Sequence, residues 1–149
     1  MDITSLITDE TILLSLEAND KADCIRQMAG QLQQTGFVAD LTAYVEAVEA
    51  REETGSTGIG FGVAIPHGKS AGVGRAGLAF ARLTKPIDWD SLDGKPVTLV
   101  FMIAVPENQA GNEHLQILAA LSRKLMHEPF REQLSSAASS AEIIQLLQA

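Results

Sequence analysis

The chain has 149 residues, of which 46% are hydrophobic and 20% are charged. This size and apolar content suit one domain with a sizeable core and are too small for two ordinary domains. The formal net charge is −8, and such a negative average field repels a nucleic-acid backbone, so we expect no nucleic-acid partner.

Cysteine content and apolar runs bear on the compartment. Cys24 is the only cysteine, so a disulfide within the chain is excluded and nothing indicates an oxidising compartment. The N-terminal residues lack a basic region followed by a long apolar stretch. The longest apolar run, 97–105, is too short to cross a bilayer as a helix. We therefore expect a cytoplasmic protein without direct membrane insertion.

Two capped helices are predicted in the first third of the chain. Asn19 or Asp20 can cap the first, and its apolar residues recur at helical spacing until Gly36 ends the pattern. Asp40 can cap the second, which we expect to end at the Thr54-Gly55-Ser56 run. The apolar residues predicted to face the core are Ala22, Ile25, Met28, Ala29, Leu32, Leu41, Tyr44, Val45 and Val48.

The segment 57–68, TGIGFGVAIPHG, carries the strongest chemical signal in the chain. Imidazole titrates near neutral pH, so His67 can act as a nucleophile or take a proton. Glycines let the backbone come close to a ligand, and exposed N–H groups in such a segment suit an anion. The second predicted helix brings Arg51 to the mouth of this segment. Together these features indicate phosphate chemistry.

Strands are predicted after this segment and helices toward the end of the chain. A short apolar run at 63–65 is stopped by Pro66, a strand is expected at 76–83, and the run 97–105 is typical of a strand covered on both faces. Asn112 can cap a helix that carries His114 in its first turn. Further helices are predicted at Pro129 and after a capping box of Ser139 and Glu142. Helices before, between and after strands indicate an α/β layered domain.

Several motifs together resemble one known family. Arg51-Glu52, the run GSTGIG at 55–60 and the run AIPHG at 64–68 closely resemble the signature of fructose/mannitol-type enzyme IIA components of the bacterial phosphotransferase system. The similarity continues through Pro86-Ile87-Asp88-Trp89, Val105-Pro106 and His114-Leu115. The resemblance implies an α/β fold over residues 1–149, one layered domain whose mixed central sheet is flanked by helices on both faces.

The resemblance also implies a function and a set of site residues. The family is a phosphohistidine carrier that takes phosphate from HPr or an HPr-like phosphocarrier and passes it to a cysteine of an enzyme IIB component. His67 matches the phosphorylated histidine, His114 the second active-site histidine and Arg51 the nearby arginine. Candidate phosphate-binding groups are those of Ser56, Thr57, Gly58, Gly60 and Gly62, although Ser56 and Thr57 can equally shape the turn.

No metal or other cofactor is expected, because the phosphate arrives on a protein. The three histidines, His67, His114 and His127, lack the compact spacing of a zinc site. A site that meets protein partners should be an open shallow patch, which we expect to be ringed by apolar residues such as Ile59, Phe61 and Ile65.

The leading hypothesis is that this carrier serves sugar uptake of the fructose type, and two other functions are considered beside it. The segment 107–115 looks more like the fructose branch than the mannitol branch of the family. The first alternative is a regulatory protein of the nitrogen-related branch, in which the phosphorylation state controls binding to other proteins. The second is a hydrolase that uses Ser56 with His67, which we rank far lower because the chain lacks a nucleophile-elbow pattern.

Overall fold

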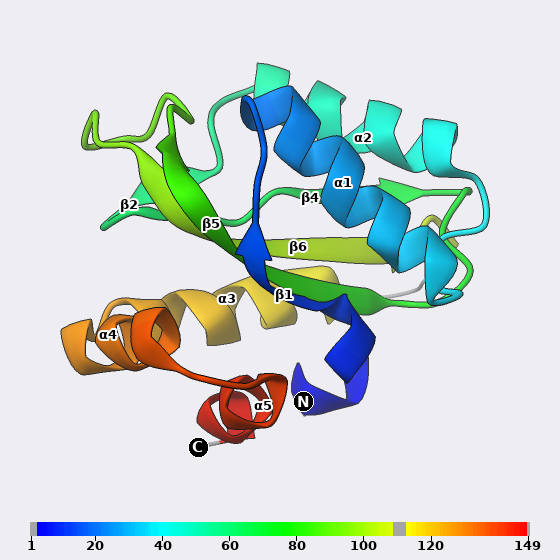
Figure 1. Ribbon diagram of the computed structural model, residues 1–149. Coiled ribbons are helices and arrows are strands. Elements are labelled where there is room, and N and C mark those ends of the chain that lie inside the picture. The colour runs from blue at the N-terminus through cyan, green and yellow to red at the C-terminus, as the bar shows by residue number, and fades with distance from the viewer. Residues whose placement is uncertain (1–2, 109–112, 149) are drawn as a thin grey trace.

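The computed structural model describes residues 3–108 and 113–148, with side chains throughout except at 113 and 114. Six strands form one mixed sheet in the order β1-β5-β6-β3-β2, and β4 also pairs with β6 (Figure 1). The strands are β1 (Ile12–Leu16), β2 (Gly58–Gly60), β3 (Val63–Ala64), β4 (His67–Ser70), β5 (Gly77–Ile87) and β6 (Val97–Pro106). Three strand pairs are parallel, namely β1/β5, β3/β6 and β4/β6. Two pairs are antiparallel, namely β2/β3 and β5/β6.

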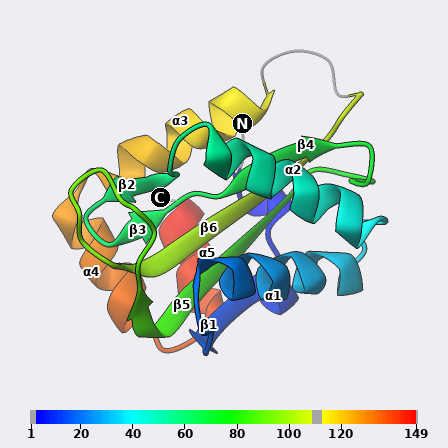
Figure 2. The same cartoon turned by 90° about the horizontal axis from the view of Figure 1, so that it is seen from above.

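Helices cover both faces of this sheet, which confirms the predicted fold class. α1 (Lys21–Gln34) and α2 (Leu41–Glu53) lie side by side on one face, as Figure 2 shows from above. α3 (Glu113–Leu125), α4 (Glu128–Ser136) and α5 (Ser140–Gln148) lie on the other face (Figure 1). Two short 3-10 turns, η1 (Ile3–Leu6) and η2 (Asp9–Thr11), precede β1.

Local signals account for the first two helices. The Asp20 carboxylate accepts the backbone N–H of Asp23 at 2.8 Å and caps α1, and the Asp40 carboxylate accepts that of Ala43 at 3.2 Å and caps α2. Each bond satisfies a helix-start donor that has no partner within the helix. The predicted caps are confirmed, and the choice between Asn19 and Asp20 falls to Asp20.

β6 is the centre of the core, as its continuous apolar run predicts. Val100, Met102 and Ala104 pack in the cluster beneath α1 and α2. Leu99, Phe101, Ile103 and Val105 pack in the cluster beneath α3, α4 and α5. All seven side chains are between 0% and 3% exposed. Since strand side chains alternate between faces, this one strand anchors both helical layers.

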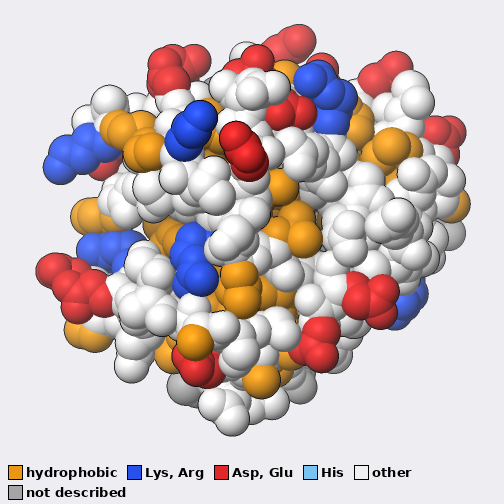
Figure 3. Space-filling view, in the orientation of Figure 1, with side chains coloured by type: hydrophobic (Ala, Val, Ile, Leu, Met, Phe, Trp, Pro, Cys, Tyr) orange, Lys and Arg blue, Asp and Glu red, His pale blue; other side chains and the backbone are white. Residues whose placement is uncertain are grey.

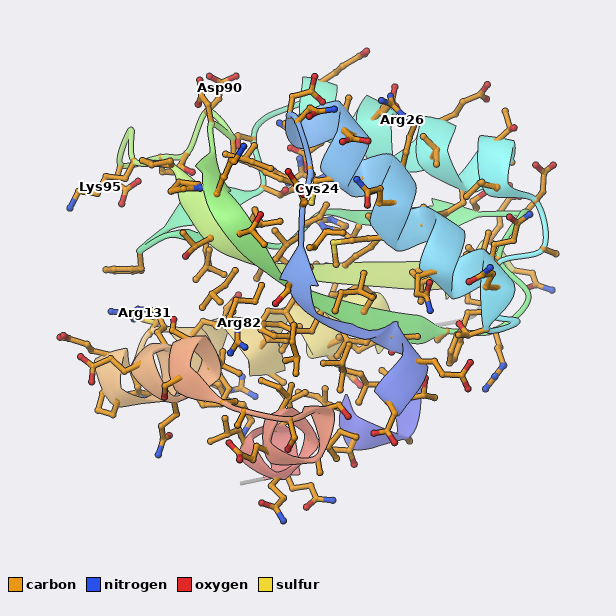
Figure 4. All side chains as sticks on the ribbon, viewed as in Figure 1. Cys24, Arg26, Arg82, Asp90, Lys95 and Arg131 are labelled. Carbon is orange, nitrogen blue, oxygen red and sulfur yellow. The ribbon has the colours of Figure 1, made fainter. Side chains whose placement is uncertain are left out.

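The helical layer below the sheet is tied to it by Arg82 of β5. Its guanidinium donates to the carbonyl oxygens of Leu134 at 3.1 Å and Ala137 at 2.8 Å, and to that of Leu14 at 3.1 Å. Figure 4 shows Arg82 between the sheet and the C-terminal helices. These bonds give the end of α4 hydrogen-bond donors that the helix cannot supply itself.

The structure differs from the predicted elements in specific places. β1, β2 and β4 were not predicted as strands, and β5 extends to Ile87, beyond the predicted end at residue 83. β4 reads His-Gly-Lys-Ser, which has no strand propensity of its own, and it is extended because it pairs with β6. The predicted capping box before α5 is half confirmed: Ser139 Oγ accepts the Glu142 N–H at 3.2 Å, but the Glu142 carboxylate accepts from Ala138 instead of Ser139. Asn112 lies outside the described residues.

Candidate functional site

His67 begins β4, directly after the proline that ends the apolar segment. It lies opposite Ile103 of β6 and is half-buried. Its Nδ1 lies 2.9 Å from the carbonyl oxygen of Ile65, two residues earlier. A carbonyl oxygen only accepts hydrogen bonds, so Nδ1 carries the proton of this bond. In the neutral ring the lone pair therefore lies on Nε2.

A cavity of about 420 Å³ adjoins His67. α2 and α3, which lie on opposite faces of the sheet (Figure 1), both contribute residues to its lining. Its lining residues are Ala47 and Arg51 from α2, His67, Gly68 and Lys69 from β4, Ile103 and Val105 from β6, and Leu115 and Leu118 from α3. The cavity thus has mainly apolar walls, with two cationic side chains beside the imidazole.

Arg51 reaches this cavity from the last turn of α2. Its Nη1 donates to Thr54 Oγ1 at 3.1 Å and to the Gly55 carbonyl at 2.8 Å. A cation at this position is also favourable because the C-terminal end of a helix carries partial negative charge. The structure therefore brings Arg51 and His67 together at one cavity.

His114, the second predicted histidine, lies at the start of α3. His114 is the second residue of α3, as its predicted position in the first turn requires, but its side chain lies outside the description. The neighbouring Leu115 and Leu118 line the cavity, so this end of α3 borders the site. Convergence of the two imidazole rings stays a prediction.

Ser56 and Thr57 use their hydroxyl groups within the protein. The Ser56 hydroxyl donates to the Trp89 carbonyl and accepts the Gly58 N–H at 3.0 Å. The Thr57 hydroxyl donates to the Glu52 carboxylate and accepts the indole N–H of Trp89 at 3.2 Å. Both side chains thus shape the loop after α2, and a contact from either to phosphate stays a prediction.

The predicted glycines lie in the β2–β3 hairpin, apart from the His67 cavity. Gly60 and Gly62 have φ angles of 100° and 77°, the conformations for which glycine is suited. The N–H of Phe61, between them, donates to Asp93 Oδ2 at 3.1 Å. Hydrogen bonds from the backbone of Lys95 and of Phe61 lower the pKa of Asp93. The hairpin, which includes Gly58, packs on the turn at 91–94, and none of its glycines is among the residues that line the cavity. A contact from these glycines to phosphate stays a prediction.

The predicted apolar rim is wrong in part. Ile65 is only 2% exposed, because its side chain points into the core. Phe61 is 61% exposed, but it lies at the hairpin tip beneath the Arg131 guanidinium, 4.3 Å from the ring centroid. The apolar groups that do line the cavity come from α2, β6 and α3.

Lys69 was not singled out from the sequence, although a signal for it was present. It stands two residues after His67 on β4, and side chains two apart on a strand point to the same side. Both line the cavity. His127 lies at the N-cap of α4, where its side chain makes no capping hydrogen bond.

Within 3–108 and 113–148, no helix combines the length and the apolar character needed to cross a membrane. The same residues contain no group of three or more His, Cys, Asp or Glu side chains placed to hold a metal ion.

Sequence comparison places this chain beside sugar-transport components. Residues 5–149 match the family described as "Phosphoenolpyruvate-dependent sugar phosphotransferase system, EIIA 2". The fructose-specific EIIABC component of Bacillus subtilis is 46% identical over 147 residues, which are 99% of this chain but 23% of that relative. The fructose-specific EIIA component of Haloferax volcanii is 42% identical over 150 residues, covering 99% of this chain and 97% of that relative. The chain therefore spans about a quarter of the first relative and nearly all of the second.

Structural comparison agrees with this placement. The nitrogen regulatory protein IIA-Ntr of Neisseria meningitidis superposes with a TM-score of 0.89 at 36% identity, covering 97% of this chain and 98% of that one. Enzyme IIA mannitol of Escherichia coli, solved in complex with phosphorylated enzyme IIB, gives a TM-score of 0.80 at 28% identity, with coverage of 95% and 98%. The chain belongs to the EIIA type 2 family of the phosphoenolpyruvate-dependent sugar phosphotransferase system.

Proposed function

We propose that this chain is a phosphohistidine carrier and that Nε2 of His67 is the atom that is phosphorylated. The donor is HPr or an HPr-like phosphocarrier, and the acceptor is a cysteine of an enzyme IIB component. The observation that carries the proposal is the bond from His67 Nδ1 to the Ile65 carbonyl, at a cavity that Arg51 also lines. Family membership supplies the reaction class, phosphoryl transfer.

The fixed tautomer suits both halves of a relay. The Nε2 lone pair attacks phosphorus, the bond from phosphorus to the donor breaks, and the ring gains positive charge that the Ile65 carbonyl stabilises through Nδ1–H. In the second transfer the cysteine sulfur attacks phosphorus, and the N–P bond breaks with its electron pair returning to Nε2. Because the ring keeps its Nδ1 proton, neutral imidazole leaves readily, and the phosphoryl group stays transferable.

Cationic groups can stabilise the negative charge spread over the transferring oxygens. Such stabilisation, together with positioning, is most of what phosphoryl transfer requires. Among the described residues, the hydrogen bonds that Arg51 donates to Thr54 and Gly55 both leave from Nη1, so one end of the guanidinium is fixed while the side chain also lines the cavity. Lys69 lines the same cavity, and the proposed role of His114 is a further contact from the start of α3.

Fructose-type sugar uptake is the specific role we favour. Relatives named as fructose-specific are 46% and 42% identical to this chain over 99% of its length. A neighbour in structure was solved with phosphorylated enzyme IIB, which supports an enzyme IIB component as the acceptor.

A regulatory role is the second candidate, and a specific observation favours it. The nitrogen regulatory protein of Neisseria meningitidis gives a TM-score of 0.89 with this chain. In that role His67 would still be phosphorylated, but the phosphoryl group would alter binding of a protein outside sugar transport.

Transfer of a radiolabelled phosphoryl group separates the two roles. The purified protein is labelled with phospho-HPr and then mixed with a fructose-type IIB domain and membranes that contain the IIC component. Sugar uptake predicts fast movement of label from His67 to IIB and then to fructose. The label should also be acid-labile and stable in alkali, because protonation of the N–P linkage improves the leaving group. If label stays on the protein while binding of a non-transport protein changes, the regulatory role replaces the transport role.

A further inference from the structure

Glu52, the residue after Arg51, is nearly buried at the end of α2. Its side chain is 7% exposed, and its Oε1 lies 2.7 Å from the Nζ of Lys21, the first residue of α1. The same ammonium lies 5.5 Å from the centroid of the Trp89 ring. A carboxylate removed from water is costly unless it is paired and hydrogen-bonded, so each contact of Glu52 matters.

The Glu52 carboxylate holds Thr57 at two points. Oε1 accepts the backbone N–H of Thr57 at 3.2 Å, and Oε2 accepts its hydroxyl. Thr57 is itself 4% exposed and is held from the other side by the indole N–H of Trp89. Glu52 therefore fixes the end of the loop at 54–57, whose start accepts the guanidinium of Arg51 through Thr54 and Gly55.

Backbone hydrogen bonds continue from Thr57 to the imidazole. The Thr57 carbonyl accepts the N–H of Ile65 at 3.0 Å. The Ile65 carbonyl in turn accepts Nδ1 of His67 at 2.9 Å. Only Thr57 and Ile65 thus stand between the Glu52 carboxylate and the ring. In each of them both the backbone N–H and the carbonyl oxygen are hydrogen-bonded along this path.

We propose that Glu52 is a positioning residue for phosphoryl transfer: through Thr57 and Ile65 it orients the His67 ring and keeps its proton on Nδ1. It also holds the loop that anchors Arg51. This inference rests on the proposed function of His67. A merely structural role for the Lys21–Glu52 pair would affect stability, whereas positioning also affects the imidazole tautomer and the rate of transfer.

Surrounding acidic residues provide a matched control. Figure 3 shows acidic side chains along the upper edge of the molecule, over α1 and α2. The acidic residues of this region that line a surface cavity with Lys21 and Glu52 are Asp20, Glu49, Glu53, Asp88 and Asp90. Glu53 is exposed and adjacent to Glu52 in sequence. Glu53→Gln therefore makes the same charge change without touching the path to His67.

The test compares Glu52→Gln and Glu53→Gln with the parent protein in two measurements. Nitrogen-15 NMR of the unphosphorylated protein, at alkaline pH where the ring is neutral, gives the fraction of His67 rings protonated on Nδ1. Labelling with phospho-HPr gives the transfer rate. In Glu52→Gln we expect the Nδ1–H fraction to fall toward that of unrestrained imidazole and transfer to slow about ten- to a hundredfold, as small misplacements of reacting groups do. Glu53→Gln should match the parent in both.

The outcomes separate this inference from the function beneath it. If folded Glu52→Gln keeps both the parent tautomer and the parent rate, Glu52 is not a positioning residue. If Glu52→Gln does not fold, Thr57→Val removes the hydroxyl that Oε2 accepts, and with it the acceptor of the Trp89 indole N–H, while the bond from the Thr57 backbone N–H to Glu52 remains. It should shift both measurements in the same direction by less, and no shift overturns the inference. If the parent itself takes no label on His67, the proposed function fails, while the NMR measurement still decides whether Glu52 sets the tautomer.

Discussion

Two neighbouring segments that look alike in sequence have different roles in the structure. The hairpin glycines at 58–62 and the His67-Gly68 pair belong to one glycine-rich run. The hairpin packs on the turn at 91–94, where Asp93 accepts the Phe61 N–H. The Gly58 N–H is taken by Ser56, in the loop after α2. His67 and Gly68 instead line the cavity between α2 and α3. A glycine-rich run therefore indicates an unusual backbone conformation. Whether an N–H group in it can bind an anion depends on which groups surround that N–H in the fold.

Sheet pairing explains the separation. β3 pairs with β6 at Leu99 and Val100, whereas β4 pairs with the same strand from Ile103 onward. Val63 lies opposite Leu99, and His67 lies opposite Ile103. These two positions of β6 are four residues apart, or about 13 Å at the usual rise per strand residue. Within the hairpin, Gly60 lies opposite Val63, and Gly58 lies opposite Ala64, which pairs with Val100 three residues before Ile103.

The largest effect is expected for His67→Ala. This change removes the only group proposed to form the N–P bond, so labelling by phospho-HPr should be lost completely while the circular dichroism spectrum stays that of the folded protein. His127→Ala is the matched control, because this exposed histidine lies at the start of α4 and should leave labelling intact. Label that persists in His67→Ala would mean that the cavity is not the site of transfer.

The second largest effect, a strong slowing of phosphoryl transfer, is expected for Arg51→Ala. Removal of one donor that stabilises developing charge commonly slows a reaction about a hundred- to a thousandfold, and we expect transfer from phospho-HPr to slow by that order without a matching loss of stability. Removal of the second predicted histidine in His114→Ala should fall in the same range. Arg26→Ala, an exposed arginine on α1 (Figure 4), should transfer at the parent rate. If Arg51→Ala and His114→Ala both transfer phosphate at the parent rate, these residues do not assist His67 as proposed.

Substitution in the hairpin should separate stability from transfer. In Gly62→Ala the new Cβ meets Thr98 Oγ1 at 3.5 Å, an ordinary contact, but the φ angle of 77° costs a residue with a side chain about 1–2 kcal/mol. Urea unfolding should show this loss, whereas the transfer rate of the folded variant should be unchanged. Gly30→Ala, in the middle of α1 with open space around it, should instead raise stability by about 0.5–1 kcal/mol. If Gly62→Ala slows transfer as Arg51→Ala does, the two segments act as one site after all.

The smallest effect is expected at Cys24, which lies on α1 facing the sheet (Figure 4). Burial, and to a lesser extent the Asp23 carboxylate, raises the pKa of this thiol from 9.0 to about 12. The folded protein should therefore not react with iodoacetamide at neutral pH, because the thiolate is the nucleophile. Since the unfolded chain ionises first, the thiol's contribution to stability is present below pH 9 and is lost as pH rises toward about 12. Rapid alkylation of the folded protein at neutral pH would contradict this burial.

Much of the fold and the core of the candidate site could be predicted because the signals are local. The caps of α1 and α2, the apolar run of β6 and the motif residues Arg51 and His67 each depend on a few neighbouring positions. Side-chain oxygens satisfy helix-start N–H groups within three residues, and an apolar run of strand length predicts burial wherever the strand lies in the sheet. The sequence by itself therefore determined the helices, the buried central strand and the candidacy of two site residues.

Only the tertiary structure decided how those elements meet. Lys21 and Glu52 are 31 residues apart in the sequence, and Thr57 and Trp89 are 32 apart, yet their contacts hold the loop beside the site. β4 is a strand only because β6 pairs with it, and Ile65 is buried because it packs in the cluster beneath α3, α4 and α5. Hydrogen-bond partners and burial depend on residues distant in the chain, and no local pattern of spacing or composition records which of them will lie side by side.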